Sequence, residues 1–134
     1  MYGQSQGVVP AEDGAETDTA KPILDHEMVG ELVEDYGADM LDELRMSLKS
    51  EGTQLVDALM VDAQESNAQD AAAHLHAIRG AGLSVGCATL GAFCQRLEVA
   101  AKGGVAPSAD DVAELSSLLE QSVVALGEAV SAAR

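Results

Sequence analysis

The sequence predicts an all-α fold, an antiparallel up-down four-helix bundle with an additional short N-terminal helix. The composition is 47% apolar but only 2% aromatic, so the core must be aliphatic, with few of the aromatic or β-branched runs that strands use. Apolar residues recur at spacings of three, four and seven, the period of an amphipathic helix. The connections between these segments are short, which forces neighbouring helices to run antiparallel. A chain of 134 residues is expected to form one domain.

The N-terminal part of the chain divides into two segments. Residues 1–21 are rich in Gly, Ala, Asp, Glu and Thr without a periodic apolar set, and we expect a flexible tail or linker there. Residues 22–134 are expected to form the helical bundle domain. Order should begin at Pro22, and the apolar residues between Ile23 and Val33 predict a short amphipathic helix that stops near Gly37.

Four longer helices are expected to follow. Leucines at helical spacing predict a helix over about 39 to 63. Asn67 is typical of a helix start and predicts a helix that runs to about Val85. The stripe from Leu90 to Ala101 predicts a third, ended by the glycines at 103 and 104. Ser108-Ala109-Asp110-Asp111 reads as a capping box that introduces the last helix.

Charge is the dominant feature of the composition. There are 7 Lys and Arg against 23 Asp and Glu, a net charge of −16. Such a surface repels phosphate backbones and anionic lipid, which argues against nucleic-acid and membrane partners. No apolar run reaches the roughly 18 residues of a membrane span. The N-terminus lacks the basic and then apolar pattern of a signal peptide, so we expect a cytoplasmic protein.

One segment of the chain, residues 71–104, is not acidic. Residues 71–104 hold three basic residues and the single acid Glu98, a local charge of +2. His74 and His76 lie in it. On a helical wheel His76 points about 140° away from the core stripe and should be exposed, whereas His74, about 60° away, should pack or hydrogen-bond at the core margin.

The residues after His76 suit an approaching anion. Gly80 lies one turn further on the same exposed face, where a helical glycine costs about 1 kcal/mol relative to alanine and leaves room for a bulky partner. Arg79 can swing toward an anion on the imidazole, and its guanidinium suits phosphate oxygens. The alternative is that Gly80 and Gly82 only permit close helix packing. Cys87 and Cys94 are expected on the same side of one helix as two buried thiols, with a disulfide or metal pair as the alternative.

These residues resemble the signature of a known family. His76-Ala77-Ile78-Arg79-Gly80-Ala81-Gly82, then Val85-Gly86-Cys87, then Leu90, Cys94, Leu97 and Glu98, is similar to the motif of histidine-containing phosphotransfer (HPt) domains of two-component phosphorelays. The resemblance runs without a gap from His76 to Glu98, and the family's four-helix fold would cover nearly all of residues 22–134.

The resemblance implies roles for the matched residues. His76 would be the phosphoacceptor, taking a phosphoryl group on Nε2 from a receiver-domain phospho-aspartate or a kinase and passing it to another receiver aspartate. Glu98 would accept a hydrogen bond from Nδ1–H and orient the imidazole. Arg79 would stabilise the phosphate and Gly80 would give steric access. For Glu98 the alternative is a solvated surface carboxylate.

The expected partners are response-regulator receiver domains and a sensor or hybrid histidine kinase, with the chain acting as a monomer. The helical wheel further predicts that Ala72, Ala73 and Leu83 dock the receiver. The chain should bind no cofactor itself, because the receiver would contribute Mg²⁺. No nucleotide-binding motif is present, so autonomous kinase activity is not expected.

Two other functions remain open from the sequence. One is a receiver-binding helical module that transfers no phosphoryl group. The other is a metal-binding or haem-binding bundle using His26, His74 and His76. It is the weaker, because residues two apart on a helix diverge by about 160° and His74 and His76 could not chelate one ion.

Overall fold

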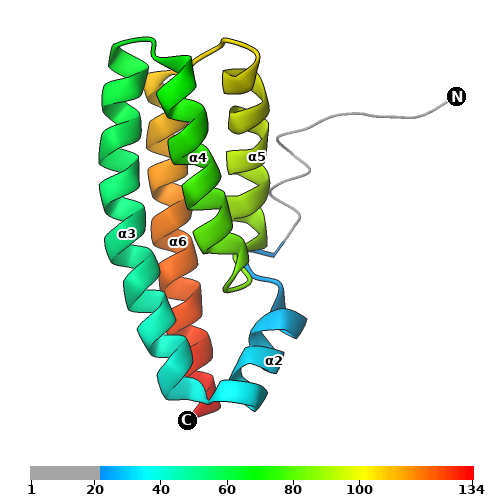
Figure 1. The fold of residues 1–134 in the computed structure, drawn as a ribbon. Helices are drawn as coiled ribbons and strands as arrows, with labels where there is room; N and C mark the ends of the chain where they lie inside the picture. The colour runs from blue at the N-terminus through cyan, green and yellow to red at the C-terminus, as the bar shows by residue number, and fades with distance from the viewer. Residues whose placement is uncertain (1–21) are drawn as a thin grey trace, which may run out of the picture.

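The computed structural model describes residues 22–134, and all regular secondary structure in this range is helical. The helices are α2 (His26–Tyr36), α3 (Ala38–Gln64), α4 (Ala68–Leu83), α5 (Ala88–Lys102) and α6 (Ala109–Ala133) (Figure 1). Within this part of the chain there is no strand, which confirms the predicted all-α class. The tail or linker predicted for residues 1–21 lies outside the described residues.

The four longer helices lie side by side, and in Figure 1 the chain reverses direction from each of them to the next. The most extensive contacts join α4 to α5 and α3 to α6. Because α4 and α5 have 16 and 15 residues against 27 and 25 in α3 and α6, they cover only part of the longer pair. The short helix α2 packs against α3 near the end that α4 and α5 leave uncovered (Figure 1).

Local side-chain hydrogen bonds set the predicted helix starts. The Asn67 side chain accepts a hydrogen bond from the backbone of Asp70, and Ser108 and Asp111 form the reciprocal capping box. Each cap satisfies backbone donors that the first helical turn leaves free. One helix end differs: α4 stops at Leu83 rather than near Val85, because the chain turns sharply into Gly86, whose φ is +82°.

The core is aliphatic, as the composition predicts. Its fully buried large side chains come from α3, α4, α5, α6 and the segment before α2, and include Leu24, Leu41, Leu59, Leu75, Ile78, Leu90, Leu115 and Leu126. Burial of these side chains is the main stabilising contribution to such a fold. No helix among residues 22–134 is both long and apolar enough to cross a membrane.

Both cysteines are buried and free, which confirms the prediction of two buried thiols. The prediction that both belong to one helix is wrong for Cys87, which is the N-cap residue of α5, because its backbone, with φ −83° and ψ 76°, is not yet helical after the turn at Gly86. Burial raises the pKa of Cys87 to about 11 and that of Cys94 to about 12. Both thiols are therefore protonated and unreactive at neutral pH.

His74 joins two helices at the core margin, as predicted. Its Nδ1 lies 2.6 Å from Oδ2 of Asp62, which α3 presents to α4. The Asp62 carboxylate is buried, whereas the His74 side chain is 31% exposed. A buried carboxylate needs such a partner, because an unsatisfied one carries a large desolvation penalty.

We expect Asp62→Ala to lower the free energy of unfolding by about 1 to 3 kcal/mol, since it removes a buried hydrogen-bonded carboxylate. Urea denaturation at pH 7 measures the change. The matched control is Asp57→Ala, which removes an exposed carboxylate from the same helix and should change stability by less than about 0.5 kcal/mol. If both substitutions change the free energy of unfolding equally, the His74–Asp62 contact has no structural role.

Candidate functional site

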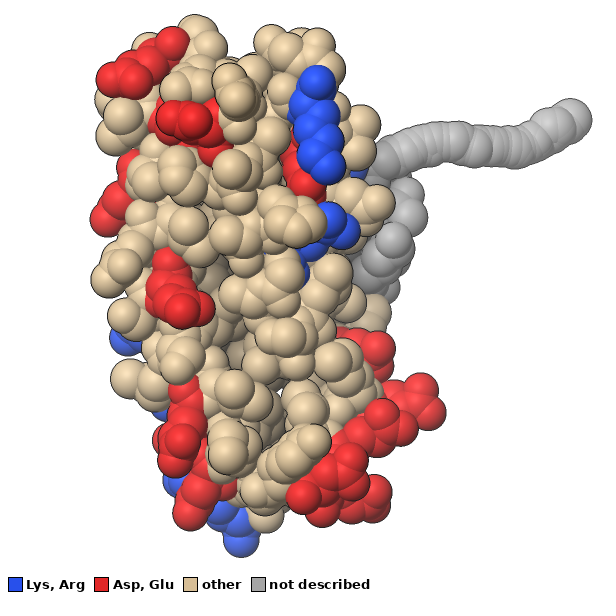
Figure 2. Space-filling view, in the orientation of Figure 1, with Lys and Arg blue, Asp and Glu red and all other residues tan. Residues whose placement is uncertain are grey.

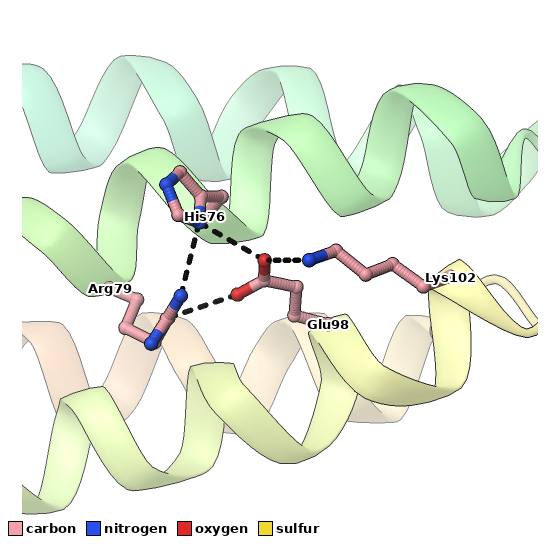
Figure 3. Close-up of polar contacts among 4 residues, drawn as sticks. All are labelled: His76, Arg79, Glu98 and Lys102. Atoms are coloured by element: carbon pink, nitrogen blue, oxygen red, sulfur yellow. Dashed lines mark hydrogen bonds and ion pairs between the residues drawn. The ribbon is translucent and has the colours of Figure 1, made fainter.

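The candidate site forms where α4 packs against α5. His76 lies on α4 with its side chain 66% exposed, and Glu98 lies opposite on α5 with its side chain 4% exposed. The His76 Nδ1 is 3.1 Å from Glu98 Oε2 (Figure 3). His76 is thus exposed as predicted, while the alternative of a solvated Glu98 is wrong because this side chain is buried between the two helices.

The Glu98 carboxylate is held by three partners (Figure 3). Arg79 donates from Nε to Oε1 at 2.9 Å, and Lys102 lies with Nζ 3.1 Å from Oε2, the oxygen that also faces His76. Burial by itself would raise the pKa of Glu98, but the hydrogen bonds from Lys102 and His76 and the charge of Arg79 outweigh it and hold that pKa below its usual value. Glu98 is therefore ionised at neutral pH.

The ionised carboxylate fixes the tautomer of His76. A carboxylate can only accept hydrogen bonds, so its contact with Nδ1 places the imidazole proton on Nδ1. In neutral imidazole the lone pair then lies on Nε2, the ring nitrogen that points away from Glu98 in Figure 3. Arg79 Nη2 is 3.1 Å from Nδ1 but cannot donate to a nitrogen that already carries a proton, so Arg79 is anchored by Glu98.

The two glycines after His76 have different surroundings. A Cβ at Gly82 would lie 3.0 Å from Leu90 Cδ2, so Gly82 permits close packing of α4 and α5. A Cβ at Gly80 would meet nothing within 4 Å, and Gly80 is exposed. Close helix packing therefore explains the glycine at position 82 but not the one at position 80. At Gly80 the missing side chain leaves the surface open one turn beyond His76.

The predicted docking residues share α4 with His76 but differ in exposure. Ala73 and Leu83 are exposed, Leu83 at 41%. Ala72 is half-buried and packs against the core, so it offers less surface than the helical wheel predicts. In Figure 2 two basic groups lie over α4 and α5, and other basic side chains lie at the opposite end of the molecule, where many acidic side chains gather over and near α2.

Sequence reasoning counted Lys102 as local positive charge but missed its contact with Glu98. The signal was present, because residues four apart on a helix are neighbours and a Glu followed by a Lys at this spacing is a favourable pair. Arg79 and Lys102, both paired with Glu98, give the site two cations beside one exposed imidazole.

The three histidines do not form a common metal site. His74 contacts Asp62 on α3, His76 contacts Glu98 on α5, and His26 lies on α2. Within residues 22–134 no group of three or more His, Cys, Asp or Glu side chains is placed to hold a metal ion.

We expect the Glu98 contacts to make stability depend on pH. Because the folded-state pKa of Glu98 is lowered, its contribution is complete above the unfolded-state value of about 4.3 and is lost as pH falls through the folded-state value. Glu98→Gln should therefore destabilise the protein at pH 7, and the difference from the wild type should shrink below about pH 4.

Urea denaturation of both proteins across this pH range measures the difference. Glu114→Gln, at an exposed position on α6, is the matched control and should track the wild type at every pH. A constant gap between wild type and Glu98→Gln from pH 7 to pH 3.5 would contradict the assignment.

The comparisons with known proteins agree with this geometry. The model of the Hpt domain family matches residues 38–125, a segment that runs from α3 into α6 and contains His76, Arg79, Glu98 and Lys102. No curated protein and no solved structure matches the chain.

Proposed function

Because the chain belongs to the Hpt domain family, we propose that it is a phosphorelay intermediate that accepts a phosphoryl group on His76. The family implies a histidine phosphotransfer role. The donor in our proposal is a receiver-domain phospho-aspartate or a kinase, and the acceptor is another receiver aspartate. The observation that carries the assignment to His76 is its exposed imidazole, whose Nδ1 contacts the buried, ionised Glu98.

The transfer step uses the Nε2 lone pair. Nε2 attacks the phosphorus of the aspartyl phosphate, the N–P bond forms, and the P–O bond breaks with its electron pair going to the aspartate carboxylate. The imidazole keeps its Nδ1 proton and becomes positively charged, so the Glu98 carboxylate stabilises the phosphorylated ring. Transfer to the next receiver reverses these changes.

The cations beside His76 serve the phosphoryl group in this proposal. Arg79 lies one turn from His76 and can offer its remaining N–H groups to phosphoryl oxygens, while its Nε stays on Glu98. Lys102 adds a second positive charge on α5. Phosphoryl transfer depends mainly on positioning and on electrostatic stabilisation of this kind.

The receiver supplies the remaining components. We propose that its Mg²⁺ completes the site, that this chain binds no cofactor, and that it has no kinase activity of its own. Gly80 gives the receiver access to His76, with Ala72, Ala73 and Leu83 around it as docking residues. We further propose that the four long helices form an antiparallel up-down bundle, and that the protein is a monomer in the cytoplasm.

A labelling experiment tests the proposal. The protein is incubated with a phosphorylated receiver domain and, separately, with phosphoramidate, a small donor that needs no docking surface. We expect acid-labile, base-stable label from both donors, mapped to His76 by mass spectrometry. Label on another residue, or a protein that binds the receiver but takes label from neither donor, would overturn it; the second result indicates an interaction module.

A further inference from the structure

Leu83, the last residue of α4, is partly exposed and packs against a glycine of α5. It is the one large apolar side chain of α4 that is exposed, at 41%. Its inner side lies on the first turn of α5, directly over Gly91. A Cβ built on Gly91 would fall 2.3 Å from Leu83 Cδ2 and 2.6 Å from Leu83 Cγ. Any residue other than glycine at position 91 would therefore force the Leu83 side chain to move.

We infer that Gly91 is a positioning residue for receiver docking, because the absence of a side chain there leaves Leu83 in place as an apolar contact about two helical turns from the phosphoacceptor. The inference rests on the proposed function and adds a residue to it. Gly91 is buried, and the three heavy atoms nearest to a Cβ built there all belong to Leu83, so in this inference Gly91 acts through Leu83.

The placement of Leu83 suits a receiver as its occupant. Residues three and four apart on a helix lie above one another, so His76, Gly80 and Leu83 follow one line along α4. A receiver that brings an anionic aspartyl phosphate to His76, beside the cations Arg79 and Lys102, passes over the open position at Gly80 and meets Leu83 next. Charge selects the partner at one end of this line and apolar contact holds it at the other.

A double-mutant cycle tests the inference, using Gly91→Ala, Leu83→Ala and the double variant. The readouts are the receiver concentration for half-maximal transfer and the maximal transfer rate. We expect each single variant to raise that concentration about tenfold, the loss of one apolar contact in an interface, with the maximal rate unchanged. The double variant should equal Leu83→Ala, because Gly91 acts only through Leu83.

Two controls keep the result interpretable. Gly30→Ala adds a methyl group to an open glycine on α2, away from His76, and should not change transfer. The double variant has no leucine to clash with, so it reports on coupling even if Gly91→Ala folds poorly. Phosphoramidate labelling should be unchanged in all variants.

The outcomes separate this inference from the proposed function. Wild-type transfer by Gly91→Ala, or effects of the two single changes that add in the double variant, would overturn the positioning role while leaving His76 as the acceptor. Absence of label on the wild type from both the phosphorylated receiver and phosphoramidate would instead overturn the proposed function.

Discussion

A His76→Gln variant is expected to take no phosphoryl label, either from a phosphorylated receiver or from phosphoramidate. Glutamine has an amide nitrogen whose lone pair is delocalised into the carbonyl, so it offers no nucleophile in place of Nε2. The His76 side chain is 66% exposed and fills no core position, so the fold should persist. Loss of label would then report on chemistry, and circular dichroism and urea denaturation check that the variant is folded.

His74→Gln is the sharpest control for this prediction. His74 lies on the same helix, and its Nδ1 also contacts a buried carboxylate, Asp62. Its side chain is only 31% exposed, whereas Glu98, the partner of His76, is also paired with Arg79 and Lys102. Full labelling of His74→Gln beside none for His76→Gln is the expected pair of results. The reverse pattern would move the acceptor to position 74.

The parts of the site that lie on one helix could be predicted from the sequence. A helix turns about 100° per residue, so the exposure of His76, the marginal place of His74 and the open position at Gly80 follow from the core stripe of α4 alone. The helix starts at Asn67 and Ser108 were equally local, because a cap is made by side chains within three residues of the start.

The parts that depend on the distance between helices could not be predicted. The helical wheel places Glu98 beside its apolar stripe, but whether it is buried depends on how closely α4 approaches α5, which Gly82 and Leu90 decide. Gly52 is a similar case. Within α3 it reads as a weak helix position, yet a Cβ there would fall 2.8 Å from a methyl group of Leu119 on α6. Neither the Gly82–Leu90 contact nor the Gly52–Leu119 contact can be recognised from the residues around it in the sequence.

Gly80→Leu is expected to slow transfer from the receiver about 100-fold, the size of effect produced by displacing reacting groups by about 1 Å. A side chain at this position meets nothing within the protein, so the variant should fold and projects into the space that a docked receiver needs. Transfer rates from a phosphorylated receiver measure the effect. Phosphoramidate labelling of the same variant should stay close to that of the wild type, because a small donor does not need the open surface.

Gly80→Ala separates function from stability at this position. Alanine in an exposed helix interior should raise the free energy of unfolding by up to about 1 kcal/mol, and it should still slow receiver transfer measurably. Gly30→Ala on α2 should give a similar gain in stability without slowing transfer. If Gly80 served only the fold, Gly80→Ala would not be both more stable than the wild type and slower in transfer. If Gly80→Ala is more stable and slower while Gly30→Ala is more stable and unchanged, the absence of a side chain at position 80 serves the approach of a partner to His76. Wild-type transfer by both Gly80 variants would contradict that role.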